Sequence, residues 1–303
     1  MSLPPFVTMR EVGPRDGLQS LGAFVPTAQK IELLNALART GLRRIEATSF
    51  VHPKLVPQMA DASEVLAGVD AAPGVQLEVL VPNAVGARRA VDSRADRIVM
   101  VIAAAEAFNQ RNVRMSVGDS LQSLAEVKEI VDNAALPLSL GIATAFGCPY
   151  SGDVAPEQVE IVVRRGVELG IDEIGVADTT GMANPVQVER LLNDLQVRFP
   201  QVQFGLHFHN TRGMGLANVL SGLRAGVSIY DASIGGTGGC PFAPRATGNI
   251  STEDCVHMLH EMGLETGLDL DRLVECARLA ERLIGRELPG QVMKAGKRSD
   301  LAT

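Results

Sequence analysis

Eight short apolar runs alternate along this chain with stretches that carry a helical pattern. A run of four to eight apolar residues between turn signals indicates a strand that is buried on both faces. Strands of this kind form parallel sheets, because the connecting helices cover both faces of such a sheet. The predicted strands are Phe6–Val12, Arg43–Ser49, Gln76–Val81, Arg97–Ala103, Leu138–Ala145, Glu173–Ala177, Gln203–His209 and Ser228–Ser233.

Proline and glycine mark the ends of several predicted helices. Pro156 and Pro185 stand where a first-turn proline belongs. Gly41, Gly170 and Gly226 each separate a helical pattern from the next strand, where a glycine lets the chain leave the helix in the left-handed conformation. The predicted helices are Thr27–Thr40, Asp61–Leu66, Asn83–Asp92, Ser120–Ala134, Pro156–Leu169, Pro185–Arg198 and Leu216–Ala225.

This order of elements predicts an α/β fold, a (β/α)8 TIM barrel with a C-terminal helical extension. A doubly wound open sheet is the alternative, and it more often has a GxGxxG turn after its first strand. Here that turn, residues 13–17, reads Gly-Pro-Arg-Asp-Gly. No linker, low-complexity stretch or repeat divides the chain. We therefore expect one catalytic domain over residues 1–303, with the terminal extension at about 252–303.

Composition excludes several classes of partner. The chain of 303 residues has a net charge of −7 and no basic cluster, which is unlike a nucleic-acid-binding protein. No apolar run approaches the roughly 20 residues that span a bilayer, and the N-terminus does not resemble a signal peptide. The four cysteines are far apart and form no CxxC motif, which is typical of reduced thiols. We expect a cytoplasmic enzyme that binds neither nucleic acid nor membrane.

Polar residues at the ends of the predicted strands indicate a metal site. In a barrel the first, seventh and eighth strands are neighbours, and sites lie at their carboxyl ends. Asp16, His207, His209 and the loop residue Asn249 would then meet at one point. Nitrogen and oxygen ligands together suit Mn²⁺, Mg²⁺, Co²⁺ or Zn²⁺. The alternative for His207 and His209 is a hydrogen-bonded pair in the core.

Three further side chains have two interpretations each. Arg15 is either a catalytic cation or an ion-pair partner of Glu46 or Asp178. Glu46 is expected to point into the barrel, where a carboxylate needs a partner or a role in the site. Cys240 follows Gly-Gly-Thr-Gly-Gly, which favours a reactive thiol on a mobile loop over a small buried residue.

Taken together, these residues resemble the 3-hydroxy-3-methylglutaryl-CoA (HMG-CoA) lyases, which belong to the DRE-TIM metallolyase superfamily. The resemblance extends over nearly the whole chain, and its separate motifs add up to a specific match. The motifs are Val12–Gln19, Ile45–Val51, Pro53-Lys54, Val56–Met59, Gly147–Tyr150, Asp178-Thr179, His207-x-His209, Gly238–Pro241 and Gly248-Asn249.

The resemblance implies retro-Claisen cleavage of HMG-CoA to acetyl-CoA and acetoacetate. It implies a divalent cation, Mg²⁺ or Mn²⁺, an acyl-CoA substrate and a homo-oligomer, a dimer or higher. It also implies these roles: metal ligands Asp16, His207, His209 and Asn249; catalytic residues Arg15, Glu46, Asp178 and Cys240; and substrate-binding residues Gln19 and Thr179.

Departures from the family pattern keep related activities open. Residues 20–22 read Ser-Leu-Gly where the common lyases have Asn-Glu and a Lys. Asn210 replaces a frequent Asp, and Arg212 replaces a common Tyr. The alternatives are a lyase for a related 3-hydroxyacyl-CoA such as citramalyl-CoA, a Claisen condensing synthase, and a non-catalytic barrel that binds CoA or metal.

Overall fold

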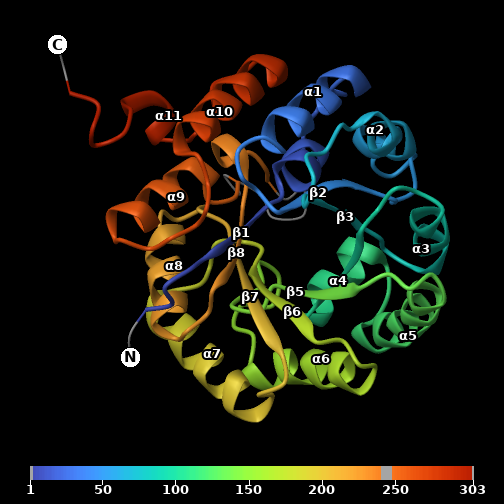
Figure 1. The fold of residues 1–303 in the computed structure, drawn as a ribbon. Coiled ribbons are helices and arrows are strands. Elements are labelled where there is room, and N and C mark those ends of the chain that lie inside the picture. Colours follow the sequence, from blue (N-terminus) through green and yellow to red (C-terminus); the bar gives the residue numbers. More distant parts are fainter. Residues whose placement is uncertain (1–2, 240–247, 302–303) are drawn as a thin grey trace.

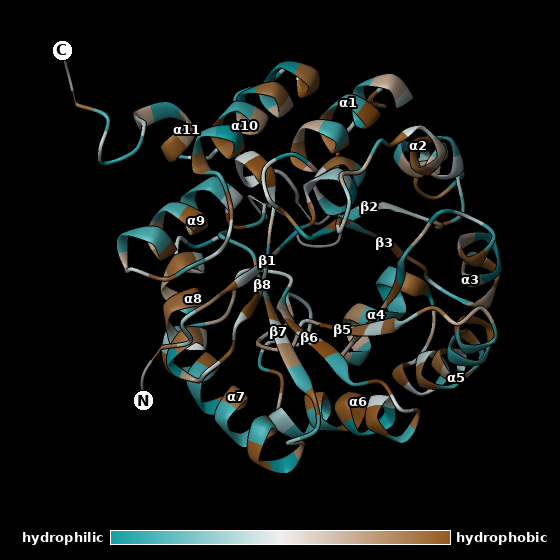
Figure 2. Ribbon diagram, in the orientation of Figure 1, coloured by the Kyte–Doolittle hydropathy of each residue, from teal (hydrophilic) through white to brown (hydrophobic). Residues whose placement is uncertain are grey.

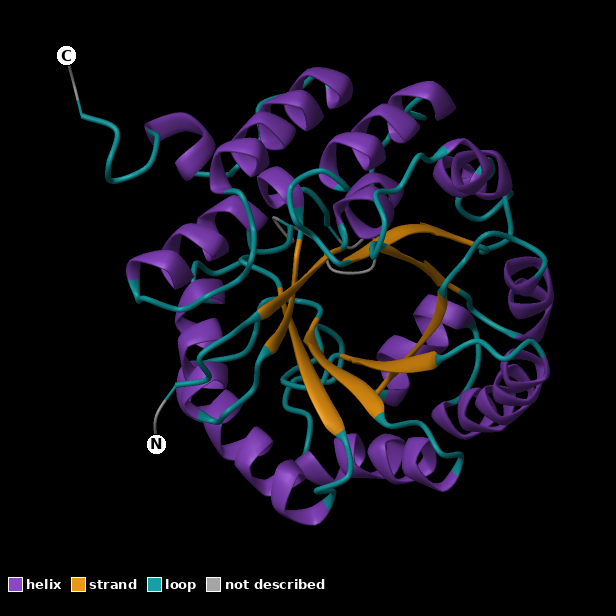
Figure 3. Ribbon diagram, in the orientation of Figure 1, coloured by secondary structure: helices purple, strands orange, loops and turns teal. Residues whose placement is uncertain are grey.

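Eight parallel strands close into a barrel in the computed structural model of this chain, which describes residues 3–239 and 248–301 (Figure 1). The strands follow one another around the barrel in sequence order, and the last pairs with the first. Figure 3 shows the strands enclosed by helices. The strands are β1 (Thr8–Glu11), β2 (Arg44–Ser49), β3 (Gln76–Leu80), β4 (Arg97–Ala103), β5 (Leu138–Ala143), β6 (Glu173–Asp178), β7 (Gln203–Phe208) and β8 (Ile229–Ala232).

The helices form the outer ring, and several of them begin and end where the sequence predicts. The helix before Gly41 begins at Thr27, and two others begin at Pro156 and Pro185. Gly41, Gly170 and Gly226 have positive φ angles, as expected for glycines that end helices. The helices are α1 (Thr27–Leu37), α2 (Ala62–Gly68), α3 (Ala84–Val91), α4 (Glu106–Val113), α5 (Val117–Asn133), α6 (Pro156–Glu168), α7 (Pro185–Arg198), α8 (Gly215–Arg224), α9 (Thr252–Glu261), α10 (Leu270–Ile284) and α11 (Val292–Ala295), with the short turns η1 (Gly13–Gly17), η2 (Pro57–Met59) and η3 (Ile234–Gly236).

Helix α4 is the main element that the sequence pattern does not predict. Its sequence, EAFNQRNV, has too few apolar residues to show a helical stripe. Buried Asn109 holds the segment instead, because its amide nitrogen donates to the carbonyls of Met115 and Ser116 and to the hydroxyl of Ser120. A tertiary hydrogen-bond network therefore stabilises a helix that local patterning leaves undetermined.

The C-terminal helices continue the ring beyond β8. Helix α10 packs against α9, which precedes it in the chain, and against α1, the first helix of the ring. Figure 2 shows that these helices carry both hydrophilic and hydrophobic residues, as expected for elements with one face on a core. Among the described helices, none is both long enough and apolar enough to cross a membrane.

The barrel interior contains a layer of buried charges. Arg44 on β2 forms two hydrogen bonds of 2.7 Å with Glu173 on β6. Strands β2 and β6 are not neighbours, so this pair spans the interior. Glu78 on β3 accepts hydrogen bonds from Arg44 and from Arg10 on β1. TIM barrels usually fill this space with branched apolar side chains, so the ion pairs here stand where a packed apolar core is expected.

These ion pairs predict acid-sensitive stability. Burial opposes the charge of Glu173, but the hydrogen bonds and charge of Arg44 lower the pKa of its carboxyl to about 2. A carboxyl with a lowered folded-state pKa stabilises the fold above its unfolded value, near 4.5, and this stabilisation is lost as the pH falls toward 2. We expect Glu173→Gln to cost about 3 kcal/mol of unfolding free energy at pH 7, and the difference from wild type to shrink between pH 5 and pH 3. Urea unfolding across this pH range measures both effects. A difference that does not change with pH would contradict the assignment.

Candidate metal and active site

A tight π-helical turn, η1, carries Arg15 and Asp16 at the end of β1. The carbonyl of Val12 accepts the backbone N–H of Gly17 at 3.5 Å, the i→i+5 bond of a π-helix, as well as those of Arg15 at 3.2 Å and Asp16 at 2.7 Å. Turns of this type are rare and occur frequently at functional sites. Gly17 ends the turn against the loop after β8, because a Cβ at this position would lie 2.3 Å from Thr237 Oγ1. The turn therefore places two adjacent charged side chains at the carboxyl end of the barrel, both only 8% exposed.

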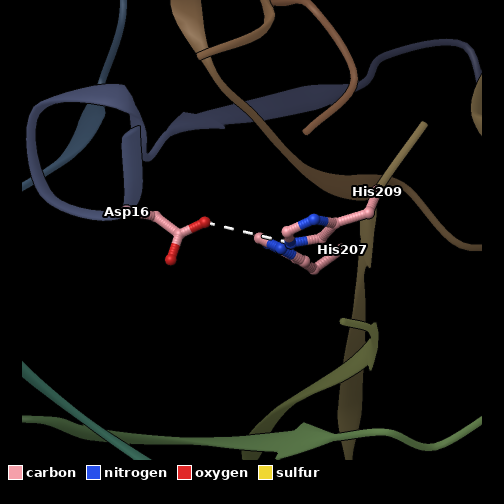
Figure 4. Close-up of side chains that lie close together, drawn as sticks. All are labelled: Asp16, His207 and His209. Carbon is pink, nitrogen blue, oxygen red and sulfur yellow. Dashed lines mark ion pairs between the residues drawn. The ribbon is translucent and has the colours of Figure 1, made fainter. Parts of the chain in front are cut away.

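Asp16, His207 and His209 form a cluster with the composition of a metal site (Figure 4). Each residue offers one ligand atom, and the three atoms lie within 4.8 Å of one another. The two imidazole rings are 5.2 Å apart, as expected for residues i and i+2 on one strand face. His209 Nε2 lies 4.0 Å from Asp16 Oδ2. Such a set of nitrogen and oxygen donors suits a divalent first-row cation.

Asn249 lies beside this cluster. It forms an isolated β-bridge with His209, and its amide nitrogen donates to Asp16 Oδ2 at 2.8 Å and to the carbonyl of Thr237 at 3.1 Å. Within the described part of the chain, Asn249 Oδ1 and His209 Nδ1 are buried without a hydrogen-bond partner. Unpaired buried polar atoms are costly and need an explanation. The residues present fit a cation, because it would satisfy Asn249 Oδ1, an acceptor atom that has no partner among the described residues.

The charge states of Asp16 and His209 also fit a cation. Burial disfavours ionisation of Asp16, but Arg15 and the two histidines lower the pKa of its carboxyl below its usual value. Burial and the neighbouring His207 lower the pKa of His209 to about 3. At neutral pH Asp16 and His209 therefore offer an anionic carboxylate and a neutral imidazole, which are the forms that bind metals. Burial lowers the pKa of His207, but the hydrogen bond and charge of Asp231 outweigh it and raise that pKa.

Asp231 is a site residue that the sequence analysis missed. Its Oδ2 lies 3.2 Å from His207 Nδ1. A carboxylate in this position fixes the tautomer and the orientation of a metal-binding imidazole. The signal in the sequence is an acidic residue inside the otherwise apolar run Ser228–Ser233, since a charge in a buried strand needs a partner.

Arg15 joins the cluster to Glu46. Its Nη1 lies 2.6 Å from Asp16 Oδ1, and its Nη2 lies 2.6 Å from Glu46 Oε2. Of the two ion-pair partners considered for Arg15, the structure therefore shows Glu46 and not Asp178. Arg15 Nε and Glu46 Oε1 are buried without a partner among the described residues. Burial raises the pKa of Glu46, although Arg15 opposes this rise. Gln19 also contacts the cluster, because its Nε2 donates to Asp16 Oδ1 at 3.1 Å.

Asp178 and Thr179 are hydrogen-bonded to the backbone. The two Asp178 oxygens accept the N–H groups of Met182 at 2.8 Å and Ala183 at 3.0 Å. Thr179 Oγ1 accepts the N–H of Thr144 at 3.0 Å. Burial raises the pKa of Asp178, and the two backbone hydrogen bonds oppose that rise. These contacts show both side chains fixing the loops after β5 and β6.

Cys240 lies outside the described residues. The glycine-rich segment before it contains Gly238, whose φ angle is +130° and whose added Cβ would lie 2.6 Å from Asn249 Nδ2. Glycine is therefore required where the loop passes the amide of Asn249. The three other cysteines are buried, as expected for packing residues: Cys148, Cys255 and Cys276.

Comparison with known proteins identifies the family. A family model described as HMGL-like matches residues 7–280. The chain belongs to the HMGL-like family. Hydroxymethylglutaryl-CoA lyase YngG of Bacillus subtilis is 42% identical over 299 residues, covering 99% of this chain and all of that protein. A cytoplasmic 3-hydroxy-3-methylglutaryl-CoA lyase of Danio rerio is 41% identical, covering 97% of this chain and 88% of its own.

A solved structure supports the same assignment. The HMG-CoA lyase of Acinetobacter baumannii, in complex with coenzyme A and 3-methylmalate, is 42% identical with a TM-score of 0.95, and the match covers 99% of this chain and 98% of that one. This HMGL-like chain is accordingly a carbon–carbon lyase. The HMGL-like family is metal-dependent, in agreement with the cluster of Asp16, His207 and His209.

Two departures from the HMGL-like pattern have structural roles. The guanidinium of Arg212 donates to the carbonyls of Thr180 at 3.0 Å and Gly181 at 2.8 Å. Asn210 Oδ1 accepts the N–H of Gly215 at 3.1 Å. Arg212 therefore joins the loops after β6 and β7, and Asn210 joins the loop after β7 to the first residue of α8.

Proposed function

We propose that this protein is a metal-dependent lyase that cleaves HMG-CoA to acetyl-CoA and acetoacetate. One observation carries the proposal: the Arg15 guanidinium lies directly beside a three-residue cluster suited to a divalent cation. The relatives with about 40% identity over nearly the whole chain are named for this activity. Coenzyme A in the similar A. baumannii structure supports an acyl-CoA as the substrate class.

Asp16, His207, His209 and Asn249 would hold the cation, which we propose to be Mg²⁺ or Mn²⁺. When bound, the cation supplies a Lewis acid that polarises substrate oxygen atoms. Carboxylate, amide and imidazole ligands are compatible with both ions. The donor set includes no thiolate among the described residues, which distinguishes it from a structural zinc site.

The cleavage requires three proton and charge movements. The 3-hydroxyl loses its proton, the C2–C3 bond breaks, and C3 becomes the ketone of acetoacetate. The bonding electrons move to the thioester, which becomes an enolate, and a proton added at C2 completes acetyl-CoA. Arg15 stabilises the negative charge on the enolate oxygen, since its guanidinium is fixed in a buried site by two carboxylates. Glu46 Oε1, which has no protein partner among the described residues, accepts the hydroxyl proton.

The remaining roles follow from the loops. Cys240 is the proposed proton donor to C2, a role implied by its place in the family motif Gly238–Pro241. Asp178 acts as a positioning residue through its two backbone hydrogen bonds, and Thr179 and Gln19 complete the surroundings of the substrate. The homo-oligomeric state and the cytoplasmic location remain part of this proposal.

A lyase for a shorter 3-hydroxyacyl-CoA is the second candidate. The A. baumannii structure contains 3-methylmalate, a small branched diacid. Arg212 and Asn210, in the loop after β7, differ from the residues common in HMG-CoA lyases. Citramalyl-CoA would be cleaved to acetyl-CoA and pyruvate by the same bond rearrangement.

A substrate panel separates these candidates. We expect the purified protein with Mn²⁺ to cleave HMG-CoA with a kcat/KM at least about 100-fold above that for citramalyl-CoA, a difference of about 2.7 kcal/mol in transition-state binding. Acetoacetate and pyruvate are measured with separate NADH-coupled dehydrogenases. Preferential cleavage of citramalyl-CoA would establish the second candidate. Thiol release from acetyl-CoA with a 2-oxoacid would instead indicate a condensing synthase.

A further inference from the structure

Arg10 holds the carboxylate of Asp231 from inside the barrel. Its Nε donates to Asp231 Oδ1 at 2.7 Å and its Nη2 donates to Asp231 Oδ2 at 2.8 Å. This is a bidentate pair, the arrangement that fixes both the position and the plane of a carboxylate. Both side chains are buried, with exposures of 8% and 6%. Asp231 is therefore locked in one orientation by a residue 221 positions away in the sequence.

The locked carboxylate also contacts the metal cluster. Asp231 Oδ2, which accepts from Arg10, is the same atom that lies 3.2 Å from His207 Nδ1. With Nδ1 directed at Asp231, His207 keeps Nε2 as its ligand atom. A continuous contact path thus leads from Arg10 through Asp231 to His207.

The other side of Arg10 is held as well. Its Nη1 lies 3.3 Å from Glu78 Oε2 and 3.7 Å from Glu173 Oε1. Burial opposes the charge of this guanidinium, but Asp231 and Glu78 raise its pKa above the ordinary value. Arg10 is thus a permanent cation placed between the interior carboxylates and the carboxylate that contacts His207.

We propose that Arg10 is a positioning residue for the metal centre, which acts through Asp231 on the ligand His207 and so raises the affinity for the divalent cation. The inference rests on the proposed metal centre. Carboxylate partners of metal-binding histidines contribute about 10–100-fold to metal affinity or activity. Arg10 extends that support by one more residue, because without it Asp231 loses the two hydrogen bonds that orient Oδ2.

Binding of Mn²⁺ alone tests this inference without using catalysis. Isothermal titration calorimetry at pH 7.5 would compare wild type, Arg10→Met, Asp231→Asn and the double variant. We expect each single variant to bind Mn²⁺ at least about 10-fold more weakly. The double variant should be no weaker than Asp231→Asn, because Arg10 acts only through Asp231. The double variant also removes both charges of the pair. It therefore provides a folded sample if the unpaired buried charge of Asp231 prevents Arg10→Met from folding.

Arg44→Met is the matched control. Arg44 belongs to the same buried charge layer and also pairs with two carboxylates, but it does not contact Asp231. Arg44→Met should lose stability, but its Mn²⁺ affinity should stay within about 3-fold of wild type, because Arg10 and Asp231 still orient His207. Unchanged affinity in Arg10→Met, or equal losses in Arg10→Met and Arg44→Met, would overturn the positioning role alone. Absence of Mn²⁺ binding by the wild-type chain would overturn the metal centre itself, and this inference with it.

Discussion

We expect Arg15→Met to lower kcat for HMG-CoA cleavage by about 10³-fold or more and to change KM much less. The scale is that of removing one fixed donor from a developing oxyanion. The charge that Arg15 stabilises exists only once the C2–C3 bond breaks, so its loss affects kcat rather than ground-state binding. Steady-state kinetics over a range of substrate concentrations separates the two parameters.

The alternative for Arg15 is a structural role as counter-charge to Glu46 and Asp16. Arg44→Met serves as the control, since Arg44 is an equally buried arginine held by two carboxylates outside the cluster. Both variants should lose stability, but only Arg15→Met should lose the bulk of kcat. Asp16 keeps its carboxylate in Arg15→Met, so Mn²⁺ binding should persist. An Arg15→Met enzyme with a near-normal kcat would show that Arg15 only neutralises its neighbours.

We expect removal of the divalent cation to abolish turnover, and addition of Mg²⁺ or Mn²⁺ to restore it. The expectation rests on the three ligand atoms of Asp16, His207 and His209 and on Asn249 Oδ1, which has no partner within the described part of the chain. His207→Ala and Asp16→Ala each remove one ligand from this small set. We expect each to weaken Mn²⁺ binding by at least about 100-fold, more than the loss of a group that only supports a ligand.

Chelation with EDTA, dialysis and metal replacement, followed by the acetoacetate assay, measure this dependence. His257→Ala is the control for histidine removal, because His257 lies in α9 and is not part of the cluster. Full turnover of a metal-stripped sample would exclude the cation from the mechanism. Equal Mn²⁺ affinity in His207→Ala and wild type would show that Mn²⁺ binds at a site that does not include His207.

The barrel was predictable because its signals are local. Each strand is an apolar run, and several helix ends carry their own markers, so positions such as Pro156, Pro185 and Gly170 identify boundaries without reference to the rest of the chain. The meeting of Asp16 with His207 and His209 follows from the same information. Once the strands close in order, the ends of β1, β7 and β8 are neighbours. The helix α4, by contrast, has no apolar periodicity and depends on Asn109 contacts.

The contacts inside the barrel were decided only by the tertiary structure. Sequence patterns indicate that Glu46 points inward, but they do not choose between Glu46 and Asp178 as the partner of Arg15. They also do not show that Asp231 lies between Arg10 and His207. The reason is physical: periodicity specifies which face of a strand a side chain occupies, whereas pairing depends on the height of that side chain in the closed barrel. That height is set by the register of strands separated by up to about two hundred residues, and it exists only after the barrel has closed.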